Sequence, residues 1–283
     1  MTSFKTFLLE YEKTTRLQHI SVRNAIRWMD KYAKKYLQAG TWIWRGLKAA
    51  DTSIAIGNPT GQRRVSAGAP NFYTLWFDNR DEFDEFPLRS ESFVCATHRG
   101  IASDYGAVFL VVPKDTAKFG VVGKADIWSL SFGPSEQRIT LAGLNEGTSS
   151  VFTALDMHQP NTYSEFVKAL KEVTFEDVRV ACIGTEWPVS WRCGTIRDAM
   201  ANGKFDTLYD LWEHFLKPEI FTTIRADDLE RIPPYNEVWT DSECLFIPFK
   251  DLQLSGEDMD LMQDFVDQYE ELKGAVHWPW DQA

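Results

Sequence analysis

The stretch PPYNEVWTDSECLFI, residues 233–247, holds two short apolar runs on either side of the polar segment TDSE. A proline pair precedes the first run, and Glu237 opens it. Short runs rich in Val, Trp, Ile and Phe around polar turn residues are typical of paired strands. We therefore expect a hairpin of residues 237–239 and 244–249, with Glu237 at the start of its first strand.

Two earlier stretches have a similar character. TWIWRGL, residues 41–47, predicts a strand over 41–44 that ends at Arg45 and Gly46. SFVCATHRGIASDYG, residues 92–106, predicts a strand over 92–96 and then a short helix within 100–106. The same reasoning places further strands at residues 72–77, 108–112, 118–122 and 178–183.

Apolar residues at three-four spacing predict helices near both ends of the chain. The expected helical spans are residues 4–37, with a break before a capping Ser21, and residues 164–173, 208–216 and 255–273. Residues 48–70, rich in Gly, Ser, Ala and Pro, are expected to form a long loop. Helices around a strand-rich middle indicate an α+β fold. We expect one domain over residues 1–283, with a helical N-terminal part at 1–40 and a helical insertion at 184–234.

Composition limits the classes of function. Aromatic residues make up 14% of the chain, which indicates a folded protein, and the net charge of −11 argues against a large nucleic-acid surface. No apolar stretch approaches the roughly 20 residues of a membrane span, and the N-terminus lacks a signal-peptide pattern. The four cysteines are widely spaced, so we expect them reduced and buried, without structural zinc, in a cytoplasmic protein. They are Cys95, Cys182, Cys193 and Cys244.

Taken in order, the three quoted stretches resemble the Arg–Ser–Glu class of ADP-ribosyltransferases. That class has an Arg before a Gly, a Ser-Thr-Ser strand followed by a short helix, and a late strand with a catalytic Glu. YNEVWTDSECLFI is also similar to the segment that carries the catalytic Glu in poly-ADP-ribose polymerases. NFYTLWFDN, residues 71–79, and KTFLLEYE, residues 5–12, are similar to small ADP-ribosyltransferase-like proteins encoded by bacteriophages.

The resemblance implies an enzyme with a split β-sheet core that cleaves the N-glycosidic bond of NAD, without a metal. It assigns catalysis to Glu237, which would bond the ribose 2′-hydroxyl and stabilise an oxocarbenium-like sugar. Arg45, next to Gly46, would hold the phosphates of NAD. The remaining binding residues that it implies, on the nicotinamide side, for base stacking or for the acceptor, are Asn71, Phe72, Tyr73, Ser92, Cys95, Thr97, His98 and Tyr235.

The chain departs from the family pattern at two places. The Ser-Thr-Ser triplet reads Cys95-Ala96-Thr97, with Ser90 and Ser92 upstream, and Tyr235 replaces the Glu or Gln found two residues before the catalytic Glu. The acceptor therefore stays open between protein, nucleic acid and water.

Two other functions remain alternatives. A DNA N-glycosylase of the same fold would flip out its target base and meet phosphates with arginines; the candidates are Arg63, Arg64, Arg89 and Arg99. A non-catalytic phage or host-interaction protein would explain the altered triplet. Three of the candidate site residues also have a plain structural interpretation. Arg45 would form a surface ion pair, Glu237 would be a charge on an edge strand, and His98 would be a helix-start residue.

Overall fold

The chain divides into two compact units. Unit 1 comprises Met1–Tyr11, Val65–Asp84 and Asp126–Phe221, and unit 2 comprises Glu12–Arg64, Glu85–Ala125 and Thr222–Ala283. The computed structural model describes residues 10–11, 17–48, 53–61, 65–66, 70–124, 126–132, 139–183 and 189–249, together with positions 257, 260, 261 and 264.

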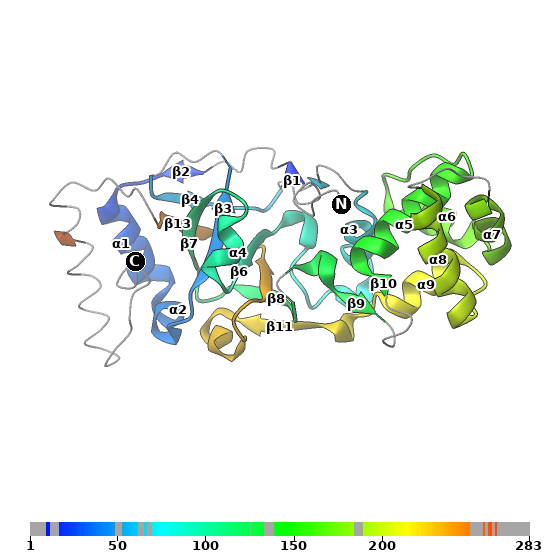
Figure 1. Cartoon of the computed structure of the whole chain (residues 1–283). Coiled ribbons are helices and arrows are strands. Elements are labelled where there is room, and N and C mark those ends of the chain that lie inside the picture. The colour runs from blue at the N-terminus through cyan, green and yellow to red at the C-terminus, as the bar shows by residue number, and fades with distance from the viewer. Residues whose placement is uncertain are drawn as a thin grey trace. The chain divides into compact units, whose positions relative to one another are not determined.

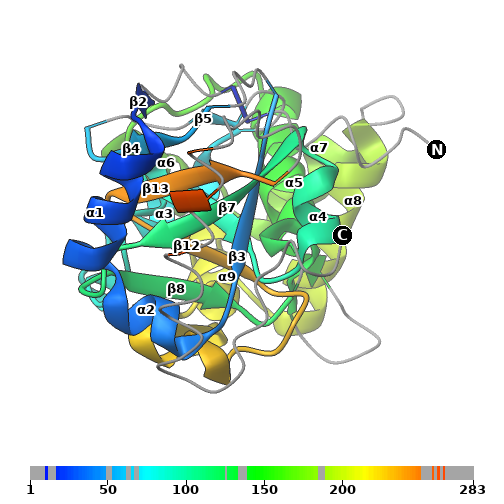
Figure 2. The ribbon, with the colours of Figure 1, turned by 90° about the vertical axis from the view of Figure 1, so that its left-hand side faces the viewer.

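An antiparallel sheet of nine strands dominates unit 2. Figures 1 and 2 show how its labelled strands are arranged. Its order is β11-β8-β12-β6-β3-β7-β13-β4-β2. The central strands are almost entirely buried, in keeping with their content of Val, Ile, Leu, Phe and Trp. The bounds are β2 (Gln18–His19), β3 (Ile43–Leu47), β4 (Ala55–Gly57), β6 (Phe93–Ala96), β7 (Ala107–Pro113), β8 (Lys118–Val122), β11 (Phe221–Arg225), β12 (Glu237–Thr240) and β13 (Cys244–Pro248).

The sheet consists of two parts joined at one residue pair. Strand β3 meets β6 only at Trp44 and Ala96, whereas it pairs with β7 at five positions. Strands β12 and β13 lie four positions apart in the sheet, yet only residues 241–243 connect them. Four strand spacings measure about 19 Å, more than the roughly 14 Å that four extended residues reach. The sheet therefore curls over at the join, and Phe93 of β6 meets Phe246 of β13 with ring centroids 5.0 Å apart.

This crossover corrects the expected hairpin. Both predicted strands exist, but β12 pairs with β6 and β8, and β13 pairs with β4 and β7. The segment TDSE passes from one part of the sheet to the other. The predicted strands at 92–96, 108–112 and 118–122 are confirmed as β6, β7 and β8, whereas β3 runs beyond its predicted end through Arg45 and Gly46 to Leu47.

Short helices pack beside this sheet. Helices α1 (Val22–Tyr32) and α2 (Lys34–Ala39) lie beside the sheet in Figure 2. Their buried side chains join the core formed by β3, β7 and β13. Ser21 caps α1 as predicted, because its hydroxyl accepts a hydrogen bond from the N–H of Asn24. The expected short helix is α4 (Arg99–Ser103), and the 3₁₀ helices η3 (Arg89–Glu91) and η6 (Ala226–Arg231) complete the unit.

Unit 1 is largely helical. Large aromatic side chains form its core, with the Phe72 ring stacked on the Phe166 ring at 4.6 Å. Its elements are α3 (Phe72–Phe77), α5 (Leu141–Ala154), α6 (Tyr163–Glu172), α7 (Phe175–Ile183), α8 (Val189–Gly203) and α9 (Leu208–Phe215), the 3₁₀ turns η2 (Asp81–Phe83), η4 (Ile127–Ser129) and η5 (Pro218–Ile220), and the strand pairs β1 (Glu10–Tyr11) with β5 (Val65–Ser66) and β9 (Ser131–Phe132) with β10 (Ile139–Thr140).

Two predicted strands are helices instead. All six residues of α3 are buried, and a short run that is apolar throughout has no period to separate helix from strand. In α7 the buried residues Val178, Ala181 and Cys182 follow helical spacing, which the β-branched residues of the segment conceal. The helices predicted at 164–173 and 208–216 are confirmed as α6 and α9, and α8 and α9 lie within the expected insertion at 184–234.

Several expectations fall wholly or partly on residues that the structure does not describe. Residues 4–9 of the predicted N-terminal helix lie outside the described residues, and Glu10–Tyr11 form strand β1 rather than helix. The predicted loop at 48–70 contains β4 and β5. Most of the predicted helix at 255–273 lies outside the described residues, while positions 257, 260, 261 and 264 are helical.

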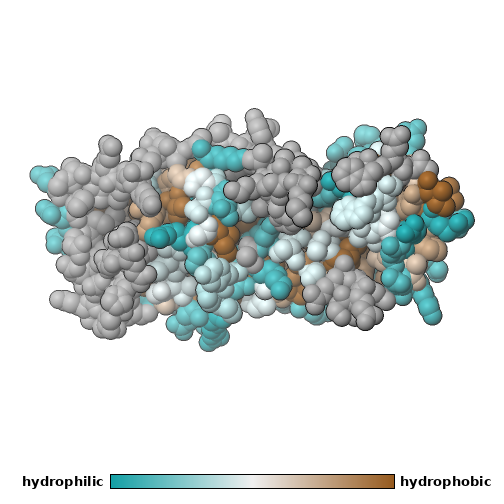
Figure 3. Space-filling view, viewed as in Figure 1, coloured by the Kyte–Doolittle hydropathy of each residue, from teal (hydrophilic) through white to brown (hydrophobic). Residues whose placement is uncertain are grey.

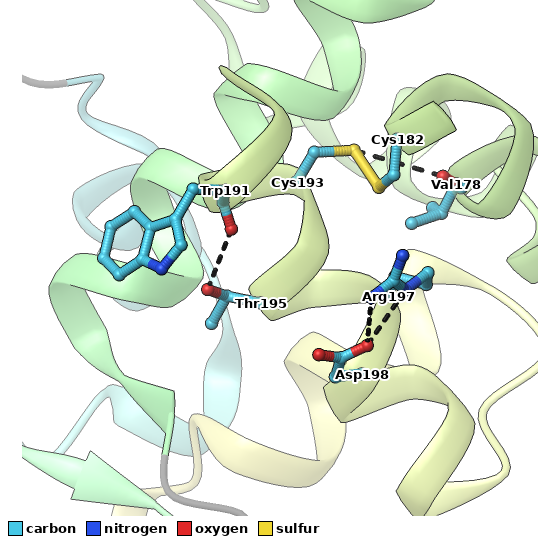
Figure 4. The surroundings of a disulfide bond; sticks show 7 residues. All are labelled: Val178, Cys182, Trp191, Cys193, Thr195, Arg197 and Asp198. Carbon is cyan, nitrogen blue, oxygen red and sulfur yellow. Dashed lines mark hydrogen bonds and ion pairs between the residues drawn. A yellow bond between two sulfur atoms is a disulfide. The ribbon is translucent and has the colours of Figure 1, made fainter. Parts of the chain in front are cut away.

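A disulfide corrects the expectation of four reduced cysteines. Cys182 of α7 and Cys193 of α8 form a disulfide, with Cα atoms 5.4 Å apart (Figure 4). Cys95 and Cys244 are buried and lie outside this disulfide. Consecutive helices α7 and α8 bring the two residues together, which their spacing in the sequence does not reveal.

The same two helices also have exposed apolar side chains, which are Val180, Ile183 and Trp191. Figure 3 shows hydrophobic surface over α7. None of the helices that the structure describes is long and apolar enough to cross a membrane.

Gly120 of β8 is expected to tolerate no side chain. Trp239 of β12 lies directly over it, and a Cβ there would overlap the indole ring. Gly120→Ala should lower the free energy of unfolding by about 1–3 kcal/mol, the usual effect of overpacking. Gly123→Ala is the matched control, because a Cβ on Gly123 meets nothing within 4 Å. Equal urea-denaturation midpoints for the two variants would contradict this packing.

The disulfide is expected to stabilise unit 1. It closes a loop with a sequence separation of 11, and a loop of that size contributes about 2–4 kcal/mol by restricting the unfolded chain. Dithiothreitol should therefore lower the thermal midpoint of the wild-type protein. The double variant Cys182→Ser/Cys193→Ser should melt at the lower temperature with or without reductant. A wild-type midpoint that does not respond to reductant would contradict the assignment.

Candidate functional site

A buried ion pair marks the start of β12. The guanidinium of Arg89 donates from Nη2 to Oε1 of Glu237 at 2.5 Å, and both residues are almost enclosed, at 3% and 7% exposed. Charged side chains are rarely buried unless they are paired in this way. β12 lies between β8 and β6, so Glu237 is not the edge-strand charge of the plain interpretation. The carboxylate is held in one place within the sheet.

Trp239 positions the arginine. It follows Glu237 by two residues on β12, so the two side chains leave the same face of the strand. The indole N–H donates to the carbonyl of Pro87 at 2.9 Å, and the Phe86 ring stacks on the indole at 6.2 Å. The Arg89 guanidinium then lies over the indole, 5.1 Å from its centroid. The segment before β6 is thus fastened to β12 beside the carboxylate.

An exposed aromatic stack lies two residues before Glu237. The rings of Tyr235 and His98 are nearly parallel, at 22°, with centroids 4.0 Å apart, and Tyr235 is 55% exposed. Tyr235 also has a φ of +68°, a backbone conformation that is strained for a bulky side chain. Two residues of extended chain span about 7 Å, so the stack lies close to the ion pair along the backbone. Strain that keeps a flat ring at the surface is typical of functional positions.

Hydrogen bonds fix the backbone on both sides of this stack. The Thr97 hydroxyl accepts from the N–H of Asn236 at 2.9 Å and donates to the carbonyl of Pro233 at 3.2 Å. The Thr97 N–H donates to the Asn236 carbonyl at 2.9 Å. His98 caps α4, since its Nδ1 accepts from the N–H of Gly100, which agrees with its interpretation as a helix-start residue. The end of β6 and the approach to β12 therefore form one rigid corner.

Arg45 faces the other way. Trp44 pairs with Ala96, and Ala96 pairs with Glu237, so these three side chains share one face of the sheet. Arg45, the next residue along β3, leaves the opposite face. Its guanidinium lies over the Phe93 ring, 5.7 Å from the centroid, and donates to the carbonyl of Val94.

Arg45 therefore does not share the face of Glu237, and its burial rules out the surface position of the plain interpretation. It is 6% exposed, and burial lowers the pKa of its guanidinium. The expected role in binding phosphates stays a prediction. Gly46 has a packing role, because a Cβ there would overlap the Ala102 carbonyl of α4.

The other predicted binding residues separate into two groups. Ser92 and Cys95 are buried in unit 2, where the Ser92 hydroxyl donates to the Leu88 carbonyl at 2.6 Å. Asn71, Phe72 and Tyr73 belong to unit 1. There Phe72 stacks on Phe166, and the Tyr73 ring lies 4.8 Å from Trp128, edge to face, so both rings contribute to the helical core of that unit.

Glu243 is held by a separate set of contacts. Its carboxylate pairs with Lys114 at 2.9 Å and accepts from the indole N–H of Trp28 at 3.4 Å. This arrangement ties the start of β13 to the end of β7 and to α1. Glu243 therefore has a structural role, although it is a glutamate in the same stretch of sequence as Glu237.

The ion pair between Arg89 and Glu237 was not predicted from the sequence. Arg89 was predicted only as a phosphate contact in the DNA glycosylase alternative, and it lies 148 positions before Glu237. The available signal was the position of Arg89 just before the strand 92–96, which neighbours β12. Among the residues that the structure describes, no group of three or more His, Cys, Asp or Glu side chains could hold a metal ion.

Comparisons with protein-family models, with curated proteins and with solved structures found no match to this chain.

The strain at Tyr235 gives a stability prediction. Tyr235→Gly and Tyr235→Ala both remove the ring and its contact with His98, but only glycine adopts a φ of +68° without strain. The glycine variant should be more stable than the alanine variant by about 1 kcal/mol. Thermal denaturation of the two variants measures the difference, and an alanine variant at least as stable as the glycine variant would contradict the backbone assignment.

Proposed function

We propose that this chain cleaves an N-glycosidic bond between a sugar and a planar base, and that NAD is its substrate. The reaction would be ADP-ribosyl transfer to an acceptor or hydrolysis of NAD to nicotinamide and ADP-ribose. The observation that supports this proposal is the Glu237 carboxylate, buried against Arg89 two residues after an exposed aromatic stack. A fixed negative charge and a flat ring are the two features that such a reaction uses.

The chemistry explains both features. Departure of nicotinamide leaves positive charge on the ribose, and a preorganised carboxylate lowers the free energy of that cationic transition state. Glu237 would accept a hydrogen bond from the ribose 2′-hydroxyl and supply the negative charge that stabilises this transition state. The exposed face of Tyr235 offers π-stacking to a planar group, for which ring contacts contribute about 0.5–1.5 kcal/mol beyond buried area. Water would take the acceptor's place in the hydrolytic reaction.

We also propose that the sheet is the split sheet of the ADP-ribosyltransferase fold. Its two parts meet at one residue pair, and the late strand with Glu237 lies in the middle of one part. These features support the proposal together with the sequence resemblance around Arg45, Thr97 and Glu237. The side chains of Arg45 and Glu237 leave opposite faces of the sheet. We therefore assign catalysis to Glu237 and no catalytic step to Arg45.

Glu237→Gln tests the proposal. The substitution keeps shape and hydrogen-bonding capacity but removes the charge that acts in the transition state. We expect the wild-type protein to release nicotinamide from NAD, and Glu237→Gln to lose about 100-fold or more in kcat with KM nearly unchanged. Chromatographic assay of nicotinamide, with circular dichroism to verify folding, measures both values.

Glu243→Gln is the matched control, because its carboxylate lies in the same segment but bonds Lys114 and Trp28. It should keep wild-type kcat. Loss of activity in Glu243→Gln with a normal Glu237→Gln would move the reaction to the other carboxylate. If the protein creates abasic sites in DNA and releases no nicotinamide from NAD, a DNA glycosylase is favoured. If it forms neither abasic sites nor nicotinamide, the alternative of a non-catalytic binding protein is favoured.

A further inference from the structure

The contact between Arg89 and Glu237 joins two segments that each have their own support. Glu237 is fixed through its backbone, because β12 pairs with β6 on one side and β8 on the other, and its N–H donates to the Lys124 carbonyl at 2.8 Å. A glutamate side chain nevertheless has three rotatable bonds, which the backbone does not determine. The 2.5 Å contact with Nη2 of Arg89 holds Oε1 at one point.

Arg89 is itself rigid. Its guanidinium is 3% exposed and lies over the indole of Trp239, which the Pro87 carbonyl and the Phe86 ring hold in turn. A planar guanidinium packed on an indole loses little further freedom when it donates to a carboxylate. Arg89 is the more enclosed partner of the pair, at 3% exposed against 7% for Glu237, so Glu237 is the partner with more access to a bound substrate.

We infer that Arg89 is the positioning residue for Glu237: it fixes the carboxylate for the reaction without touching the substrate. This inference rests on the proposed function. Misplacement of a reacting group by about 1 Å can lower turnover about 100-fold while leaving substrate affinity intact. A purely structural arginine would affect the fraction of folded protein and leave the turnover of each folded molecule unchanged.

The test compares two variants with NAD as the probe, using only protein whose folding is verified by circular dichroism and thermal denaturation. Arg89→Met keeps the length of the side chain and removes its donors, and kcat should fall about 100-fold with KM changed less than about threefold. Arg89→Lys keeps a charged donor but not the planar fork, and kcat should fall about tenfold, again at nearly constant KM. Partial recovery by the conservative variant is the signature of positioning.

Arg80→Met is the matched control. Arg80, in unit 1, also lies over an indole, 4.3 Å from the Trp76 centroid, and pairs with the carboxylates of Glu82 at 2.9 Å and Glu213 at 3.2 Å. It should lower stability without changing kcat. Wild-type kcat in either folded Arg89 variant, or a loss confined to KM, overturns the inference; if Arg89→Met does not fold, Arg89→Lys decides alone. A wild-type protein that releases no nicotinamide overturns the proposed function and this inference together, whereas an inactive Glu237→Gln beside active Arg89 variants overturns the inference only.

Discussion

The ion pair between Arg89 and Glu237 is buried, and its consequences follow from that burial. Removing two charges from water costs several kcal/mol for each ion, so such a pair adds little net stability. Removing one partner lowers the free energy of unfolding by about 3–5 kcal/mol, because the remaining buried charge is left without compensation. A chain that maintains such a pair in the middle of a sheet keeps a carboxylate in a fixed position with restricted access to water.

The geometry of the sheet determines which residues can reach that carboxylate. The join at Trp44 and Ala96 places β3 next to β6, and alternation along the strands then assigns Arg45 and Glu237 to opposite faces. The three-residue crossover from β12 to β13 curls the sheet, which separates Glu237 from the contacts of Glu243. Two glutamates six residues apart therefore have different surroundings: one meets a buried arginine and the other a half-exposed lysine.

Much of this fold follows from local sequence, and the rest depends on contacts distant in the chain. The strands β6, β7 and β8, the Ser21 cap and the helices α6 and α9 were predictable, because alternation, capping chemistry and helical spacing act within a few residues. The crossover between β12 and β13 was not, because a polar turn of that length fits a hairpin equally well. The helix α3 and the disulfide also depend on packing within unit 1, which no local pattern encodes.

The candidate site shows the same division. Glu237, Tyr235, Thr97 and His98 were named from the sequence, and the structure brings their segments together at the corner between β6 and β12. Arg89 as the partner of Glu237 follows only from the three-dimensional arrangement. Asn71, Phe72 and Tyr73 belong to unit 1, where the two rings pack into the core. The assignments of NAD, of an enzymatic activity and of one domain over residues 1–283 stay predictions.

A crystal structure of the Glu237→Gln protein soaked with NAD tests the central claim most directly. The variant should bind intact NAD, because the missing charge acts in the transition state. The account predicts that the ribose attached to nicotinamide lies within hydrogen-bond distance of the side chain at position 237, with a planar ring of the dinucleotide on the exposed face of Tyr235. NAD bound only among the helices of unit 1, or no bound NAD at saturating concentration, would contradict it.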